Sequence, residues 1–197
     1  EQMLSDLFDC NRANVRRALS TLATMHVVDI QPNRGAFIAT PSPKEAYDVF
    51  EARRTIERTI AHGVIDNVCT KDITEMRATI TAEAEARAAG NKPAELRLSR
   101  IFHMHLALIA GNQVLERFLN ELTLRTTLII GLYNKVGLSS CAGDDHSNIV
   151  QAIEARDEAR LIWLLEEHLD HLEASLDFEY SAPPFSTLAE QLLITPN

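Results

Sequence analysis

The stretch Asp144–Leu172, DDHSNIVQAIEARDEARLIWLLEEHLDHL, decides how this chain folds and where its polar site lies. Its apolar residues recur at the three- and four-residue spacing of helices that bury one face. We therefore expect two helices, with His146 near the start of the first and His168 inside the second. Each histidine shares a helix face with aliphatic side chains, so both are expected to point into a core.

The composition favours a helical protein. The chain has 197 residues, of which 46% are hydrophobic, with only seven glycines and seven prolines. No apolar run approaches the roughly 18 residues that a membrane span needs, and the acidic N-terminus lacks the features of a signal peptide. Cys10, Cys69 and Cys141 show no CxxC spacing and indicate free thiols in a reducing compartment. A cytoplasmic protein without a membrane partner is expected.

The charge is distributed unevenly along the chain. The net charge is −9, and all of it lies in residues 42–197, because residues 1–41 contain four arginines and four acidic side chains. Proteins that bind nucleic acids are normally basic, so the total charge argues mildly against that role. A neutral segment with clustered arginines can still bind phosphates when the acidic bulk faces away.

Residues 1–40 predict a winged helix-turn-helix. A short helix over 1–9 is followed by a break, and Asn11 then caps a second helix that begins at Arg12. The segments VVDIQ and AFIAT, on either side of the tight turn 32–35, predict a β-hairpin. The second helix is expected to bury one apolar stripe, made by Val15, Ala18, Leu19 and Leu22.

This order of elements suits DNA recognition. The second helix of such a head enters the major groove and offers its first side chains to base edges, where arginine pairs with guanine. The hairpin tip can reach a phosphate or the minor groove, and glycine lets its backbone approach closely. The residues available for these contacts are Arg12, Ala13, Arg16, Arg34 and Gly35.

Residues 1–39, EQMLSDLFDCNRANVRRALSTLATMHVVDIQPNRGAFIA, resemble the winged head of the GntR family of bacterial regulators. The positions that match the family pattern are Arg12, Val15, Arg16, Ala18, Leu19, Leu22, Gly35 and Phe37. The departures are Asn11 for serine, His26 for glycine and Asn33 for a wing glycine; His26 is expected to end the helix in the left-handed conformation. The family has a further helix before this point, so the head is expected to be truncated.

A linker over residues 39–43 leads into six predicted helices. Ser42-Pro43-Lys44-Glu45 forms a capping box with proline at the first helical position, and Thr70 is expected to cap the second of these helices. The loops between the helices are short, which predicts an antiparallel bundle. The helices are expected at about 43–67, 70–89, 94–110, 114–136, 145–155 and 157–178.

The fold is therefore expected to be mainly α. Residues 1–40 form the truncated winged head, and residues 41–180 form the six-helix bundle. Residues 181–197 form a tail with a short helix near 188–193.

Three histidines fall on apolar helix faces. His103 lies with Phe102 and Leu106, whereas His105 points elsewhere and is expected at the surface. A single histidine on such a face is usually a hydrogen-bonded core residue. Three of them on three helices favour a metal site, because three neutral imidazoles with an open position suit Zn²⁺ or a similar ion. The predicted ligands are His103, His146 and His168.

Arg53 is the other polar residue expected in the core. The apolar stripe around it consists of Ala46, Val49, Phe50, Ile56, Ile60 and Val64. A buried arginine needs an anionic partner. Glu57, four residues further on, is one candidate, and an anionic ligand is the other. The sequence leaves both open.

Residues 43–178 resemble the FCD effector-binding domain of the FadR-like branch of the GntR family, and six helices are typical of its vanillate-regulator subgroup. The resemblance rests on Arg53–Glu57, Phe102-His103, Gly111-Asn112, His146 through Ile153, and His168-Leu169. Metal-holding members use one aspartate and three histidines, which implies His103, His146 and His168 here and leaves His171 out. Ser99 stands where the aspartate is expected.

Ser99 changes what the site is expected to hold. Serine is a poor ligand for a divalent ion, so three neutral nitrogens remain. This set favours Zn²⁺ or Ni²⁺ over hard ions such as Mn²⁺, with water or an effector completing the coordination. Without metal, the same pocket would act as a polar cage that binds an anion through Arg53 and the imidazoles.

These features predict a ligand-responsive bacterial transcription regulator and not an enzyme. We expect a homodimer on pseudo-palindromic operator DNA, with a small organic acid bound at Arg53, Ser99 and the three histidines. A regulator for which the metal itself is the effector is one alternative. A metal-dependent enzyme is another, but Glu57 is the only further acid or base placed near the site, and it pairs more simply with Arg53.

Overall fold

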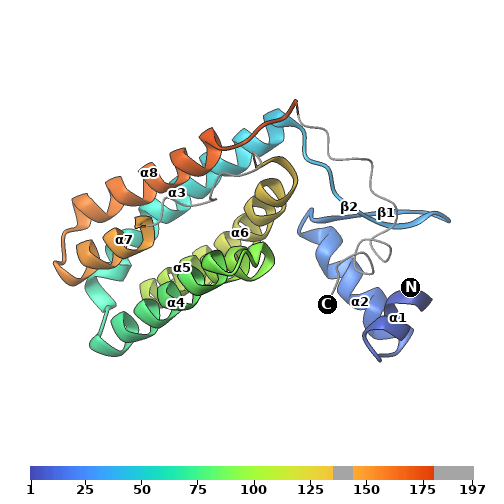
Figure 1. The fold of residues 1–197 in the computed structure, drawn as a ribbon, viewed down its shortest axis with the longest axis horizontal. Helices are drawn as coiled ribbons and strands as arrows, with labels where there is room; N and C mark the ends of the chain where they lie inside the picture. The colour runs from blue at the N-terminus through green and yellow to red at the C-terminus, as the bar shows by residue number, and fades with distance from the viewer. Residues whose placement is uncertain (135–143, 180–197) are drawn as a thin grey trace. The chain divides into compact units, whose positions relative to one another are not determined.

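The described residues form two compact units. The computed structural model describes residues 1–134 and 144–179, and its contacts separate Glu1–Ser42 from Pro43–Phe178 (Figure 1). The fold is mainly α, as predicted, with one two-stranded sheet in the first unit. Within these residues, no helix is both long enough and apolar enough to cross a membrane. The short helix expected near 188–193 lies outside the described residues.

The first unit contains the predicted helices and hairpin. α1 (Gln2–Leu7) is followed by α2 (Arg12–Thr24), and the side chain of Asn11 caps α2 by accepting a backbone N–H at 2.8 Å. β1 (Val28–Gln31) pairs antiparallel with β2 (Gly35–Ile38). A small core holds these elements together and consists of Leu4, Val15, Leu19 and Val28.

Two residues that depart from the family pattern, His26 and Asn33, adopt the left-handed backbone conformation. His26 has a φ of 56° after α2, and Asn33 has a φ of 61° in the hairpin turn. Asparagine tolerates this region better than most residues, so Asn33 can replace a wing glycine at small cost, and His26 ends the helix as predicted. Ala18 corrects the predicted stripe: it is exposed, because it lies at the edge of the stripe and its methyl group does not reach the core.

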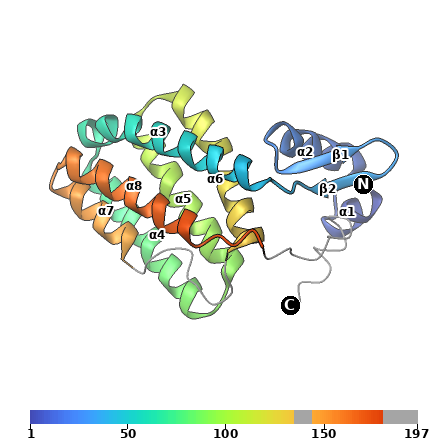
Figure 2. The same cartoon turned by 90° about the horizontal axis from the view of Figure 1, so that it is seen from above.

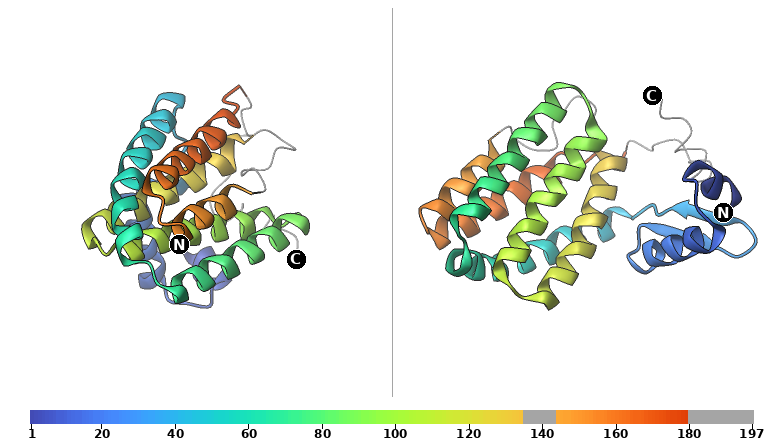
Figure 3. Two further views of the ribbon diagram at one scale, coloured as in Figure 1. Left: turned by 90° about the vertical axis from the view of Figure 1, so that its left-hand side faces the viewer. Right: turned by 90° about the horizontal axis from the view of Figure 1, so that it is seen from below.

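The second unit is a bundle of six helices, α3 (Pro43–Asn67), α4 (Thr70–Ala88), α5 (Lys92–Ala110), α6 (Gln113–Tyr133), α7 (Asp145–Glu154) and α8 (Glu158–Ala174). α5 contacts α3, α4 and α6, and α7 contacts α4 and α8 (Figure 2). End-on, the helices surround a shared interior (Figure 3). Segments that are far apart in the sequence therefore present side chains to one core.

Two helix starts differ from the prediction by one or two residues. Thr70 is the first residue of α4 and not its cap; Cys69 is the N-cap, and its backbone N–H donates to Asp72 at 2.9 Å. α5 begins at Lys92 because the side chain of Asn91 caps it. In both places a neighbouring polar group supplies the cap.

Two helices end earlier than predicted, α6 at Tyr133 and α8 at Ala174. An isolated antiparallel bridge joins the residues that follow them, Asn134 and Leu176. The backbone N–H of Asp177 also donates to the carbonyl of Tyr133 at 2.7 Å. This pairing takes both segments out of helical geometry, and the periodicity of a single helix does not reveal it.

α3 and α5 approach each other closely at Gly63. A Cβ on Gly63 would lie 2.8 Å from the carbonyl oxygen of Ala110, which is closer than side chains normally pack. The amide of Asn67 donates hydrogen bonds to the carbonyls of Ile109 and Ala110 at 3.1 and 3.3 Å. These contacts fix the spacing of the two helices.

Gly63→Ala is expected to lower the free energy of unfolding by about 1–3 kcal/mol, because the added methyl must displace the backbone of α5. Gly131→Ala is the matched control: an added Cβ there meets nothing within 4 Å, so the change should be neutral or stabilise by up to about 1 kcal/mol. Urea unfolding followed by circular dichroism measures both. Equal effects of the two substitutions would contradict the close approach.

Candidate metal and effector site

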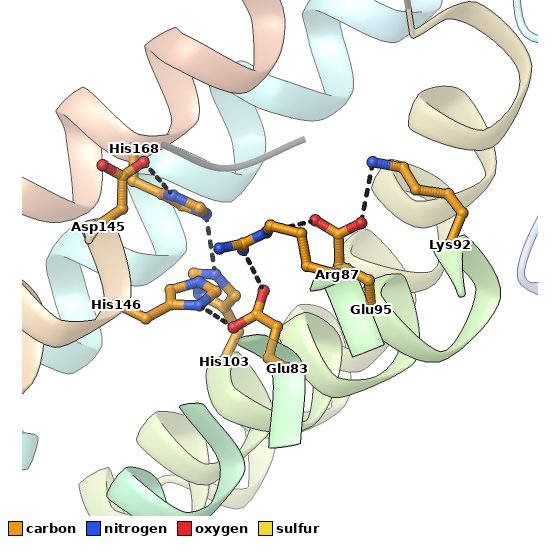
Figure 4. A network of polar contacts seen from close by, with 8 residues as sticks. All are labelled: Glu83, Arg87, Lys92, Glu95, His103, Asp145, His146 and His168. Atoms are coloured by element: carbon orange, nitrogen blue, oxygen red, sulfur yellow. Dashed lines mark hydrogen bonds and ion pairs between the residues drawn. The ribbon is translucent and has the colours of Figure 1, made fainter. Parts of the chain in front are cut away.

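Three histidines from three helices meet inside the bundle. His103 on α5, His146 on α7 and His168 on α8 are 0%, 4% and 1% exposed. One ring nitrogen of each lies within 4.8 Å of those of the other two (Figure 4). The structure thus brings the three predicted metal ligands together.

The two other bundle histidines near these ligands stay outside the cluster. The side chain of His105 is 17% exposed and pairs with Glu75 at 3.1 Å. The side chain of His171 is 49% exposed. Helix periodicity therefore selects His103 and His168 in agreement with the geometry.

A carboxylate lies beside the Nδ1 atom of each clustered histidine. The pairs are His103 with Glu57 (3.1 Å), His146 with Glu83 (2.7 Å) and His168 with Asp145 (3.1 Å). The first is a close contact without hydrogen-bond alignment, whereas the other two are hydrogen bonds. A carboxylate at Nδ1 favours the tautomer with its proton there and leaves the Nε2 lone pair for a metal.

The Nε2 atoms of the three histidines have no hydrogen-bond partner among the described residues beyond this cluster. Nε2 of His146 is buried and has no hydrogen-bond partner among the described residues. Nε2 of His103 and Nε2 of His168 are 3.2 Å apart, and with the protons on Nδ1 two lone pairs would face each other. Buried polar atoms are rarely left in this state. A divalent ion would satisfy all three nitrogens, so the residues present fit such an ion.

Burial keeps the imidazoles of His103 and His168 neutral. It lowers the pKa of His168 to about 4, although the hydrogen bond to Asp145 opposes that shift. Burial also lowers the pKa of His103 well below its ordinary value, against the opposing effect of Glu57. Neutral imidazole is the form that binds metal, so both rings are ready to act as ligands near neutral pH.

Two of the neighbouring carboxylates, Glu57 and Asp145, stay ionised. Burial alone would raise the pKa of Glu57, but the charge of Arg53 and the nearby His103 hold it well below its usual range. Burial likewise opposes the lowered pKa of Asp145, which the hydrogen bond to His168 produces. Both acids can therefore polarise the imidazoles that they face.

Arg53 is buried, with 4% of its surface exposed, and its Nε donates to Glu57 Oε1 at 2.6 Å. The pair expected from the sequence is therefore formed. Its two Nη groups make no hydrogen bond with any described residue. One edge of the guanidinium is engaged and the other remains available to an anion, so the two alternatives for Arg53 are compatible.

Ser99 lies one turn before His103 and is half-buried, and its hydroxyl makes no hydrogen bond with a described residue. The carboxylates at the site are instead Glu83 and Asp145, which sequence reasoning missed. Glu83 follows Met76 and Ile80 at helical spacing, and this pattern was the available signal for its burial. Asp145 adjoins a ligand in sequence and was hidden by its place at a helix start.

The residues expected to contact DNA are exposed on the first unit. Arg16 and Arg12 lie on α2, with their Nη2 atoms 2.8 and 3.8 Å from Glu1. Arg34 stands beside the ring of Phe37 at the hairpin turn, 5.6 Å from its centroid. The remaining two predicted contacts, Ala13 and Gly35, are exposed as well. Gly35 has a φ of 114°, a conformation that glycine alone adopts without strain.

The chain is similar to known regulators. Residues 48–171 match the FCD domain family, which covers more than half of the chain. The sequence is 22% identical over 193 residues to the HTH-type transcriptional regulator LutR of Bacillus subtilis (strain 168), covering 87% of each protein. E. coli McbR/YncC has a similar fold, with a TM-score of 0.76 at 14% identity over 87% of this chain and 82% of that one. Streptococcus agalactiae GntR is also similar, with a TM-score of 0.58 at 21% identity over 87% and 86%.

Arg53→Met in the metal-free protein is expected to lower the free energy of unfolding by about 3–5 kcal/mol, because Glu57 is then buried without its counter-charge. Lys44→Met, which removes an exposed pair of the same spacing with Asp48, is expected to change nothing measurable. Chemical denaturation in the presence of a chelator measures both. The assignment is wrong if Arg53→Met unfolds at the same denaturant concentration as Lys44→Met.

Proposed function

We propose, from the premise that this chain belongs to the GntR family of transcriptional regulators and carries an FCD domain, that it is a metal-loaded regulator controlled by a small organic acid. It is a transcription regulator and not an enzyme; the curated relative that it resembles is itself a transcriptional regulator. The observation that carries the proposal is the convergence of three buried imidazoles, each with a carboxylate beside Nδ1.

The proposed metal ligands are His103, His146 and His168, and the expected ion is Zn²⁺ or Ni²⁺. Three neutral nitrogens suit these ions, and Ser99 adds no charge that would favour a harder one. Carboxylates next to metal-bound imidazoles orient the rings and raise their basicity. Such an ion would supply positive charge and an open coordination position for a ligand oxygen.

The proposed effector is a small carboxylate held between this centre and Arg53. The unengaged Nη edge of Arg53 offers the paired donors that a carboxylate accepts. Ser99, on the same helix as His103, would supply a hydroxyl. Binding must favour one of two arrangements of the protein for the effector to change DNA affinity.

We further propose that the first 40 residues read operator DNA in the bacterial cytoplasm, as part of a homodimer, while residues 41–180 carry the effector site. A dimer places two recognition helices on successive half-sites of a pseudo-palindrome. The contacts of Arg16 and Arg12 with Glu1 are exposed, and such pairs are weak enough for a phosphate or a base to replace the acid. The expected contacts are Arg12, Ala13, Arg16, Arg34 and Gly35.

A regulator that senses the metal itself is the second candidate. The deep burial of all three ligands favours it, because a fully enclosed ion can order the three helices that supply them without any organic ligand. The two functions differ in what changes operator affinity. Metal alone would be sufficient for the second candidate, whereas the first needs an organic acid in addition.

The protein is expected to bind one equivalent of Zn²⁺ or Ni²⁺, and His146→Ala is expected to abolish tight binding. Glu83→Gln should weaken it about 10–100-fold, because the imidazole of His146 loses the carboxylate that orients it. His171→Ala, the exposed neighbour of the site, is the control and should bind like the wild type. Calorimetric titration with a competing chelator measures all of these. A wild type that binds no metal would remove the basis of the proposal.

Arg16→Ala and Arg34→Ala are each expected to weaken binding to an operator selected from random DNA by about tenfold or more. Loss of a phosphate contact should also reduce the dependence of log affinity on log salt by about one. Arg77→Ala is the control, because Arg77 pairs with Glu154 on the surface of the bundle. Fluorescence anisotropy at several salt concentrations gives both quantities. Unchanged affinity in both head variants would exclude the assigned DNA surface.

A further inference from the structure

A chain of ionic contacts leads from the histidine cluster to the surface of the bundle (Figure 4). Glu83 Oε2 is 2.7 Å from His146 Nδ1, and Glu83 Oε1 is 3.5 Å from Arg87 Nη2. Arg87 Nε donates to Glu95 Oε1 at 2.9 Å, and Lys92 lies 3.2 Å from the other oxygen of Glu95. The network joins α4, α5 and α7, and neither of the expected functions accounts for its cations.

Arg87 is held in place by a short bond to Glu95 and makes a longer contact with Glu83. The bond from Nε to Glu95 fixes the guanidinium, and Figure 4 shows that group directed towards the histidines. The contact with Glu83 is at the limit of hydrogen-bond distance. Glu83 retains His146 through its other oxygen, so it does not become unpaired when Arg87 turns to another anion.

Arg87 differs from Arg53 in its access to solvent. The side chain of Arg87 is 24% exposed, whereas that of Arg53 is 4% exposed and fixed to Glu57 at 2.6 Å. Of these two arginines, Arg87 is therefore the one that solvent reaches. The planar guanidinium presents parallel donors that match the two oxygens of a carboxylate.

The formal charges around the histidines make anion binding depend on metal. The described cations are Arg53, Arg87 and Lys92. The described carboxylates are Glu57, Glu83, Glu95 and Asp145. The formal charge of these seven groups is −1, which disfavours an anion when no metal is bound. A divalent ion reverses the sign of this charge, and a single negative charge then neutralises it.

We propose that Arg87 forms a binding subsite for the carboxylate of a monoanionic organic acid beside the three histidines, exchanging its contact with Glu83 for one with the ligand. This inference rests on the proposed function, because it places the effector of the same site. It adds three points to that function: Arg87 recognises the acid, the acid carries one negative charge, and the metal binds before the acid.

The test uses acetate as the probe and the full chain loaded with Zn²⁺. Isothermal titration should show acetate binding to the zinc-loaded wild type and no binding to the metal-free protein. Arg87→Gln should bind acetate at least tenfold more weakly, with its zinc affinity unchanged within threefold. Arg77→Gln, the same change ten residues earlier on α4, should behave like the wild type.

Arg87→Lys is the second variant, because it keeps the charge and the partner of Glu95 but loses the planar pair of donors. It should bind acetate with an affinity between those of the wild type and Arg87→Gln. If Arg87→Gln does not fold, the acetate affinity of Arg87→Lys tests the subsite in its place. Wild-type acetate affinity in whichever arginine variant folds and binds zinc would overturn the subsite and leave the metal proposal standing. A zinc-loaded wild type that ignores acetate would also overturn the subsite. Failure of the wild type to bind zinc would overturn both proposals.

Discussion

The burial of three imidazoles in one place is the constraint on which the interior of the bundle depends. A neutral imidazole still carries one donor and one acceptor, and both need partners away from water. Nδ1 of His146 and of His168 hydrogen-bond to Glu83 and Asp145, and Nδ1 of His103 lies 3.1 Å from Glu57. Together the histidines and acids come from α3, α4, α5, α7 and α8, so one polar cluster sets the relative positions of five of the six helices of the bundle.

The acids in turn require counter-charges, and two of the helices supply them locally. Arg53 precedes Glu57 by four residues on α3, and Arg87 follows Glu83 by four on α4. This spacing places acid and base on one helix face, so each helix brings a buried carboxylate and its partner together as it forms. The two pairs differ in burial: Arg53 is enclosed in the core, whereas solvent reaches Arg87. A bound anion therefore has two cations available that differ in how freely they can move.

Local periodicity predicted the parts of this arrangement that lie within single helices. His103, His146 and His168 were found because each interrupts an apolar stripe, and the Arg53–Glu57 pair was found because four residues make one turn. Glu83 and Asp145 were missed as members of the site because the histidines that they contact, His146 and His168, lie on other helices. The ends of α6 and α8 were placed too late for the same reason, since the bridge between Asn134 and Leu176 joins distant segments. Pairing between helices is the information that one sequence does not display.

The serine at position 99 affects the charge of the site as well as its geometry. An aspartate there would add a protein ligand and a negative charge, so a divalent ion would leave the described cluster close to neutral. With Ser99, a site loaded with the proposed ion would keep a positive charge and have one ligand fewer, and an external anion could supply both the negative charge and the ligand. The substitution that weakens the metal site thus increases its need for an acid. If the ion and the acid each stabilise the other in this way, their binding is linked, and the acid should raise metal affinity by the same factor by which metal raises the affinity for the acid.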